Sequence, residues 1–230
     1  MASATGTEIE LKLRVDDLAA LMRIVVETGA RPAFTAIQRN QYLDTSKRGL
    51  DRQKFVLRLR EESSPESTTV YLTAKGASKK SADGTLSSVA EEEIVVSSSE
   101  AAAIVATPSL AFELLADDAD ATDARRALVQ AMREAAGDES LAFVGEFLNE
   151  RTRIDVDFPE GFHGVLELDR VRFPGDQIHH EVEFEVPAGT EAHVAKKAFE
   201  ALFVRAGVVG RAAPGKAKRF FQALRGEKLS

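Results

Sequence analysis

The 230-residue chain contains no cysteine and no tryptophan, and only 2 tyrosines. Without cysteine it can form no disulfide framework, no thiolate zinc site and no cysteine nucleophile. Its apolar runs fall far short of the ~18 residues that a transmembrane helix needs. Residues 1–7 are small and polar, without the basic start and apolar core of a secretory signal. We therefore expect a cytoplasmic protein with no membrane partner.

Basic residues are also in deficit. The chain has 30 Lys and Arg against 37 Asp and Glu, so its formal net charge is −7. Nucleic-acid binding draws on an excess of positive charge, so we expect no nucleic-acid partner. Nothing in the sequence indicates an obligate protein partner. The expected ligand is therefore a small molecule, and its nature has to come from how the charges are distributed.

Hydrophobic periodicity predicts an α+β protein with about eight strands in mostly antiparallel order. Helices are expected after Asp17, where Gly29 ends the helix, over residues 190–206, and after Pro214. We expect a single domain, residues 1–230, with a mostly helical insertion at about 98–138. Residues 76–88 are expected to form a long polar loop. The pattern fits either a sheet curled into a barrel or a strongly twisted sheet. The strands are expected at residues 8–15, 37–43, 55–61, 68–75, 89–96, 142–158, 164–172 and 178–186.

Most of these strands carry charged residues on one face and apolar residues on the other. A solvated strand face usually mixes its charges, because like charges adjacent on a sheet repel each other. Here Glu181, Glu183 and Glu185 form an all-acidic run, whereas Arg58 and Arg60 form a basic pair. We infer that the charged faces line the inside of a barrel and that helices cover the apolar faces.

Such an interior suits a polyphosphate with its cations. Carboxylates that converge in a pocket are costly unless a cation neutralises them, and hard oxygen ligands select Mg²⁺ or Mn²⁺. Arginine and lysine in the same interior suit phosphate oxygens, arginine through its bidentate fork and lysine as a point charge.

Several motifs in this order resemble the CYTH family, also called triphosphate tunnel metalloenzymes. The first is Glu8-Ile9-Glu10-Leu11-Lys12, which is similar to the ExExK signature of the family. The resemblance covers about residues 8–221 and is greatest to the plant-type inorganic tripolyphosphatases. The other motifs are Tyr42-Leu43-Asp44-Thr45, Leu57-Arg58-Leu59-Arg60, Leu72-Thr73-Ala74-Lys75-Gly76, Glu91–Glu93, Arg151, Leu166-Glu167-Leu168-Asp169, Glu181–Glu185 and Gly215-Lys216-Ala217-Lys218-Arg219-Phe220.

The resemblance implies a closed eight-stranded antiparallel β-barrel with a charged interior and helices packed outside. It implies that Glu8, Glu10 and Glu183 hold Mg²⁺ or Mn²⁺. It also implies that Glu91, Glu93 and Glu185 act in catalysis, at a second metal site or by positioning the attacking water. Phosphate oxygens would be bound by Lys12, Arg58, Arg60, Lys75, Arg151, Arg153 and Lys216, with Lys54 as a helper.

The implied activity is hydrolysis of inorganic tripolyphosphate by in-line attack of a metal-activated water. Two alternatives stay open: a class IV adenylyl cyclase or a thiamine triphosphatase on the same scaffold, and a module that binds polyphosphate without cleaving it. Thr73 and Ala90 depart from the plant-type pattern, which leaves the substrate less certain than the chemistry.

Three other features of the sequence receive no functional role. Gly210 to Lys216 spells GxxxxGK, but Ala217 follows where a P-loop needs serine or threonine. Arg125 and Arg126 are interpreted as surface charges, and Asp117, Asp118 and Asp120 as a solvated connection between helices.

Overall fold

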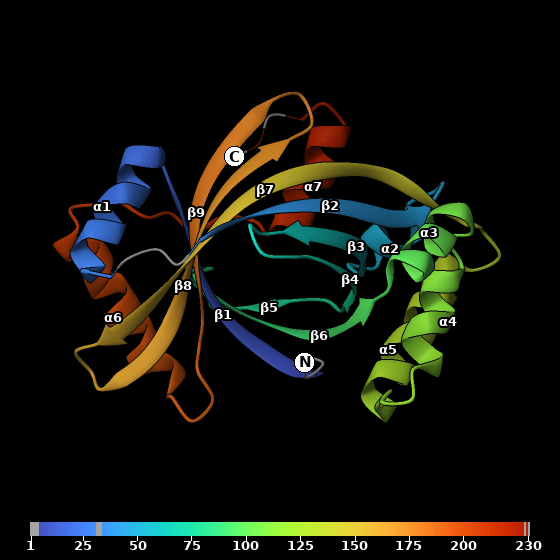
Figure 1. Ribbon diagram of the computed structural model, residues 1–230, viewed down its shortest axis with the longest axis horizontal. Helices are drawn as coiled ribbons and strands as arrows, with labels where there is room; N and C mark the ends of the chain where they lie inside the picture. The colour runs from blue at the N-terminus through green and yellow to red at the C-terminus, as the bar shows by residue number, and fades with distance from the viewer. Residues whose placement is uncertain (1–4, 31–33, 228, 230) are drawn as a thin grey trace. The chain divides into compact units, whose positions relative to one another are not determined.

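The computed structural model describes residues 5–30, 34–227 and 229, with residues 5–8 described by their backbone alone. Within these residues, eight long strands pair in the order β1-β9-β8-β7-β2-β3-β4-β6, and β1 also pairs with β6. The order therefore closes on itself, and the expected closed antiparallel barrel with helices outside is confirmed. Figure 1 labels these strands and helices. The strands are β1 (Thr5–Val15), β2 (Thr35–Thr45), β3 (Val56–Ser63), β4 (Thr68–Lys75), β6 (Leu86–Val96), β7 (Leu141–Phe158), β8 (Phe162–Phe173) and β9 (Gln177–Glu185).

The contacts of the chain divide it into two compact units. Unit 1 comprises residues 1–7, 38–78 and 89–147, and unit 2 comprises residues 8–37, 79–88 and 148–230. The helical segment expected at about 98–138 belongs to unit 1 and contains α3 (Ser98–Ala106), α4 (Leu110–Asp117) and α5 (Asp123–Ala136).

The core of unit 1 lies between its strands and these three helices. Leu57, Leu72 and Ile94 project from the apolar faces of β3, β4 and β6, and they share one buried cluster with Phe112 of α4 and Met132 of α5. Two of these helices, α3 and α5, begin where a side chain supplies an acceptor for a free amide. Ser97 and Glu100 form a capping box at the start of α3, which satisfies two of the amides that would otherwise lack a partner.

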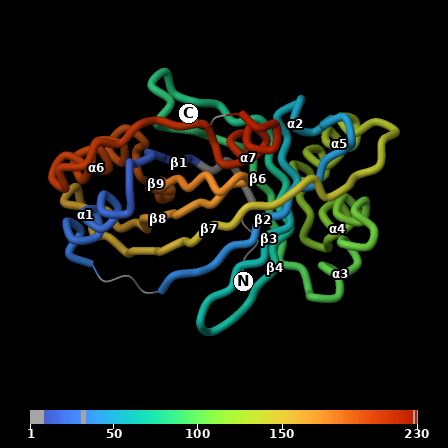
Figure 2. The backbone as a smooth tube through the Cα atoms, turned by 90° about the horizontal axis from the view of Figure 1, so that it is seen from above, coloured from blue at the N-terminus to red at the C-terminus, as the bar shows by residue number. Residues whose placement is uncertain are grey.

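Unit 2 repeats this arrangement with α1 (Leu18–Thr28) and α6 (Ala192–Arg205). Ile24 of α1 and Phe199 of α6 are fully buried against Leu11, Leu166 and other residues of β1, β7, β8 and β9. Figure 2 shows the two helices lying next to each other on this part of the sheet. Asp17 accepts a hydrogen bond from the Ala20 amide at 2.8 Å to start α1, and Gly29, with φ of 65°, ends the helix.

Two details differ from the sequence-based expectation. The predicted loop at 76–88 contains a two-residue strand, β5 (Lys79–Lys80), which pairs with Ser87 and Ser88 at the start of β6. A four-residue helix, α2 (Gly49–Arg52), follows β2. Asp44 at the end of β2 accepts hydrogen bonds from the amides of Leu50 and Asp51 at 2.9 and 3.1 Å, so this aspartate shapes the turn.

The interpretation of Arg125 as a surface charge was wrong. Its side chain is fully buried and pairs with Glu92 at 3.0 Å and with Asp118 at 2.5 Å. The error has a simple origin: Glu92 lies between Glu91 and Glu93 but points to the opposite, helix-packed face of β6. A carboxylate buried there needs a counter-charge, and α5 supplies it.

No helix among the described residues is both long and apolar enough to span a membrane.

Replacing Arg125 by methionine should lower the free energy of unfolding by about 3–5 kcal/mol, because the buried Glu92 carboxylate then has no counter-charge. Chemical denaturation of the Arg125→Met variant measures this loss. Arg126→Met is the matched control, since Arg126 is the next residue on the same helix and is exposed; it should change stability by less than about 0.5 kcal/mol. Equal losses in the two variants would contradict the assignment of Arg125 to a buried ion pair.

Candidate metal and phosphate sites

Strand register brings the charged residues of unit 2 together. In the antiparallel pair β1–β9, Lys12 lies opposite Glu183. In the pair β8–β9, Glu183 lies opposite Glu167, and Asp169 lies opposite Glu181. Because directly opposed residues of a sheet project to the same side, the period-2 pattern of each strand becomes one continuous charged face. This face is opposite the one covered by α1 and α6.

Three carboxylates form the centre of this face, and we call Asp169, Glu181 and Glu183 the acidic triad. Each offers one oxygen, and these oxygens all lie within 4.8 Å of one another. Two ligands on opposite sides of an ion such as Mg²⁺ lie about 4.2 Å apart, given metal–oxygen distances of ~2.1 Å. The spacing and the hard oxygen donors therefore fit a divalent cation, although the identity of the metal is not determined by them.

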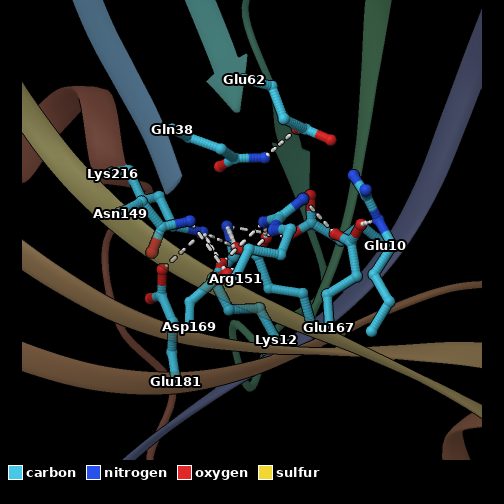
Figure 3. A network of polar contacts seen from close by, with 12 residues as sticks. Glu10, Lys12, Gln38, Glu62, Asn149, Arg151, Glu167, Asp169, Glu181 and Lys216 are labelled. Carbon is cyan, nitrogen blue, oxygen red and sulfur yellow. Dashed lines mark hydrogen bonds and ion pairs between the residues drawn. The ribbon is translucent and has the colours of Figure 1, made fainter. Parts of the chain in front are cut away.

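Among the described residues, four cations pair with the acidic triad, and Lys12, Arg151 and Lys216 are labelled in Figure 3. Lys216 lies 2.7 Å from Asp169, 2.6 Å from Glu181 and 2.5 Å from Glu183. Arg151 donates to both oxygens of Asp169, at 2.8 and 2.6 Å, and to Glu183 at 2.6 Å.

Lys12 and Arg219 complete the set. Lys12 bridges Glu183 at 2.5 Å and Glu10 at 2.7 Å, and Arg219 pairs with Glu181. All three residues of the acidic triad are thus compensated by positive charge.

The balance of burial and charge sets the protonation states. Burial raises the pKa of Glu183, but Lys12, Lys216 and Arg151 outweigh it, so the net pKa lies well below its usual range. Burial likewise opposes ionisation of Asp169 and Glu181, and their cationic neighbours again bring each pKa below its ordinary value. Burial lowers the pKa of Lys216, but the negative charges of the acidic triad outweigh burial, so the net pKa lies above its ordinary value. The cluster is therefore fully charged near neutral pH.

Lys216 reaches the acidic triad from α7 (Lys216–Leu224), the last helix. This helix is anchored by Phe220 and Phe221, which are both buried. Arg219 is also fully buried, with its guanidinium over the ring of Phe173 at 5.0 Å, and it contacts the ring nitrogen of His179 at 3.0 Å. The sequence pattern after Pro214 therefore places a lysine and an arginine, three residues apart, on one face of a helix.

Unit 1 carries a second charged cluster, which is centred on Arg58. The Arg58 guanidinium is 3.1 Å from the Thr73 hydroxyl and 3.5 Å from the Glu93 carboxylate. Thr73 donates to the same carboxylate at 2.6 Å, and Lys75 pairs with Glu91.

The Arg58 cluster also includes a carbonyl acceptor. The side-chain carbonyl of Asn40 accepts from Arg60 at 3.2 Å and lies 3.5 Å from Arg58. Two arginines and a lysine thus lie on the same face of the sheet as two carboxylates. This arrangement can bind phosphate oxygens.

The structure places the residues implied by the resemblance in different ways. Lys12, Arg151, Lys216 and Glu183 meet in the cluster of unit 2, where Arg153 also pairs with Glu167 at 3.1 Å. Arg58, Arg60, Lys75, Glu91 and Glu93 meet in the cluster of unit 1. The roles assigned to all of these residues stay predictions.

For three of the implied residues the contacts given above establish no place in either cluster. Glu185 is exposed near the end of β9, opposite Glu10, and Lys54 is exposed before β3. Glu8 lies in β1, but its side chain is outside the described part of the structure. Its predicted role as a metal ligand, like that of Glu10, is not tested by the geometry.

Sequence reasoning did not assign roles to Asp169, Glu181 or Arg219. Asp169 and Glu181 were visible as members of alternating acidic runs, two residues away from Glu167 and Glu183. Asp169 and Glu181 meet in the acidic triad because of the register between β8 and β9, and this register cannot be read from the sequence. Arg219 could have been found from its i+3 spacing to Lys216.

The strands thus form a closed antiparallel barrel whose charged face carries buried clusters of acidic and basic residues. The sequence matches the CYTH domain over residues 6–221, so the chain belongs to the CYTH family.

Solved structures share the fold. One is a Hippeastrum protein, proposed to be an adenylyl cyclase and described as having a dominant triphosphatase activity; it is 25% identical, with a TM-score of 0.75 over 96% of this chain and 97% of that one. A Bacillus halodurans protein, proposed to be an adenylate cyclase, is 22% identical, with a TM-score of 0.60 over 94% and 99% of the two chains. A Pyrococcus horikoshii protein is 18% identical, with a TM-score of 0.54 over 89% and 94%. No curated protein sequence matches the chain.

The environment of His179 predicts a loss of stability in mild acid. Burial lowers the pKa of His179 to about 4, and the positive charges of Arg219 and Arg14 add to the effect. In the unfolded chain the same ring titrates near 6.5. The unfolded state therefore binds more protons between pH 6.5 and 4, so stability should fall as the pH drops through this window.

Urea unfolding at pH 7.0 and pH 5.2 measures this slope, because both values lie above the ordinary pKa of a carboxyl group. A His179→Gln variant should lose less stability than the wild type between the two conditions. Between pH 7 and 8 the two proteins should show the same pH dependence. Identical losses of stability from pH 7.0 to 5.2 in both proteins would show that the pKa of His179 is not lowered in the folded state.

Proposed function

We propose that this protein hydrolyses inorganic tripolyphosphate to pyrophosphate and phosphate with the help of Mg²⁺ or Mn²⁺. The observation that carries the proposal is the cluster of unit 2, in which three buried carboxylates suited to a metal are interleaved with lysine and arginine. A site for a metal alone has no need of four cations, and a site for an anion alone has no need of three buried carboxylates. A polyphosphate that binds with its divalent cation needs both.

The acidic triad would hold the divalent cation, together with Glu10 and Glu8 if the roles implied by the resemblance apply. When bound, such a cation supplies charge neutralisation to the phosphate oxygens and to the pyrophosphate that leaves. The residues of the chain do the rest. Lys12 and Arg151 would turn from carboxylates to phosphate oxygens, which are acceptors of the same kind.

The Arg58 cluster would bind phosphate oxygens in the same manner. Thr73 and Asn40 fix the orientation of Arg58, and a guanidinium held in this way offers a planar pair of N–H donors. Arg60 of β3 and Lys75 of β4 add positive charge on the same face of the sheet. Because phosphoryl transfer spreads negative charge over the oxygens of the transferred group, these cations would stabilise the transition state more than the ground state.

In the proposed reaction a water oxygen bonds to a terminal phosphorus while the bond from that phosphorus to the bridging oxygen breaks. Pyrophosphate leaves with the bonding electrons, and the proton of the water passes to a carboxylate. Glu91, Glu93 and Glu185 are predicted to lie at a second metal site or to position the attacking water. Glu91 and Glu93 are each held in place beside a cation, by Lys75 and Arg58 respectively, so their carboxylates have a defined position in the Arg58 cluster.

A second candidate is cyclisation of ATP. It is favoured by the Bacillus halodurans protein, which is proposed to be an adenylate cyclase, and by the first description of the Hippeastrum protein. The same cations would then bind the triphosphate of ATP, but the nucleophile would be a ribose hydroxyl and the leaving group again pyrophosphate. Hydrolysis of thiamine triphosphate would differ from the leading proposal only in the leaving group.

Phosphate release from tripolyphosphate, ATP and thiamine triphosphate, each with Mg²⁺ or Mn²⁺, tests the proposal. We expect tripolyphosphate to be cleaved fastest and EDTA to abolish the reaction. Asp169→Asn should lower the rate on the order of 10²-fold or more, because it removes a charged group at the centre of the site. Asp157→Asn is the matched control, since Asp157 is exposed at the far end of β7.

Each other outcome points elsewhere. Formation of cyclic AMP from ATP, with little phosphate release, would replace hydrolysis by cyclisation. Fastest cleavage of thiamine triphosphate would change the substrate and keep the chemistry. Tight binding of tripolyphosphate with no turnover on any substrate would identify a binding module. Activity that survives EDTA would overturn the role of the metal.

A further inference from the structure

The ammonium group of Lys216 lies where a metal held by the acidic triad would lie. Its nitrogen is 2.5–2.7 Å from an oxygen of each of Asp169, Glu181 and Glu183. These are the three carboxylates whose spacing fits a divalent cation. An ammonium and a metal ion cannot share the same few ångströms, since both need the same oxygens and repel each other. Binding of a metal to the acidic triad therefore requires Lys216 to leave.

Lys216 can also leave the acidic triad more readily than Arg151 can. Arg151 extends from a central strand and makes hydrogen bonds to three carboxylates. Lys216 is the first residue of α7, and its flexible four-carbon stem ends in a point charge with no fixed direction. Its side chain keeps 13% of its surface exposed, whereas Asp169 and Glu181 have none. Part of the Lys216 side chain is thus within reach of solvent, whereas the two carboxylates are not.

Helix α7 does not depend on Lys216 for its position. Arg219 ties the helix to Glu181, and Phe220 and Phe221 are buried beneath it. The Lys216 side chain can therefore rotate away while the helix stays in place. Just before the helix, the carbonyl of Ala213 accepts a hydrogen bond from Lys80 at 3.1 Å, which fixes the point from which α7 starts.

We propose that Lys216 is an exchangeable internal cation, which neutralises the acidic triad while no metal is bound and moves to a phosphate oxygen when metal and triphosphate bind together. The proposal rests on the proposed function for the identity of the anion. It makes Lys216 a positioning residue for the metal as well as a ligand of the substrate. A metal without triphosphate displaces Lys216 and leaves the ammonium without a partner. A metal with triphosphate gives it a new one.

The exchange couples the two ligands. Triphosphate should raise the affinity for the metal, and by thermodynamic linkage the metal should raise the affinity for triphosphate by the same factor. A lysine that only binds phosphate would make no difference to metal binding in the absence of triphosphate. This contrast separates the exchange from the role that the resemblance implies for Lys216.

Binding of Mn²⁺ to the protein without substrate, measured by electron paramagnetic resonance, is the direct test. In Lys216→Met the competing ammonium is gone, so we expect Mn²⁺ to bind about tenfold more tightly or better than to the wild type, since a unit charge has been removed next to the ion. Lys218→Met is the matched control, because Lys218 is exposed on the same helix, and its affinity should equal that of the wild type. Unchanged or weaker binding to Lys216→Met would overturn the proposal.

The coupling is measured by repeating the titration with a non-hydrolysable imido analogue of tripolyphosphate. In the wild type the analogue should tighten Mn²⁺ binding about tenfold or more, within the range usual for coupled sites. In Lys216→Met the factor should be several times smaller. Equal factors in the two proteins would show that Lys216 does not carry the coupling.

A second measurement uses the wild type, so that it stands if Lys216→Met does not fold. An amine-reactive acetylating reagent should modify Lys216 slowly in the metal-free protein, several times faster with saturating Mg²⁺, and slowly again with Mg²⁺ and the analogue together. Lys218, recovered in the same digest, is the internal reference and should react at one rate throughout. If the rate of acetylation at Lys216 is the same with and without Mg²⁺, the proposed exchange is wrong.

These readouts are independent of turnover. If Mn²⁺ binding behaves as expected but tripolyphosphate is not cleaved, the exchange stands and the proposed function fails. If tripolyphosphate is cleaved but Lys216→Met leaves Mn²⁺ affinity unchanged, the reverse holds.

Discussion

Mutual neutralisation of buried charges is the constraint on which the rest of this structure depends. Glu181 and Asp169 are fully buried, and a buried carboxylate without a counter-charge costs several kcal/mol. The folded state is therefore stable only if Arg151, Lys216 and Arg219 reach these two carboxylates from other elements. The pairing of β7 with β8 and the docking of α7 both serve this requirement, because the first delivers Arg151 and the second delivers Lys216 and Arg219.

The same constraint explains why the hydrophobic cores lie outside the ring of strands. A strand that presents charge on one face must bury its other face elsewhere, and helices provide the cover. In unit 2 the apolar face is covered by α1 and α6, and in unit 1 by α3, α4 and α5. Even there unit 1 accepts one buried ion pair, Glu92 with Arg125, because the run Glu91–Glu93 inevitably places its middle residue on the apolar side.

The period-2 pattern of charge was sufficient to predict the strands, their charged faces and the helices outside, since alternation is a local property of the chain. Register is not local. Asp169 and Glu181 look no different in the sequence from the exposed Asp157 and Glu185, and only their places in the paired sheet separate the buried members from the exposed ones. Arg125 was misread for a related reason: its partner Glu92 is 33 residues away, and nothing in the local pattern of α5 announces it.

Charge balance also bears on what the site binds. Among the described residues, the ion pairs around the acidic triad join five carboxylates, Glu10, Glu167, Asp169, Glu181 and Glu183, to five cations, Lys12, Arg151, Arg153, Lys216 and Arg219. A lone metal ion would leave this cluster with excess positive charge, and a lone polyphosphate with excess negative charge. A polyphosphate that brings its divalent cations disturbs the balance least, because each cation released from a carboxylate finds a phosphate oxygen. A site balanced in this way favours the pair of ligands over either one alone.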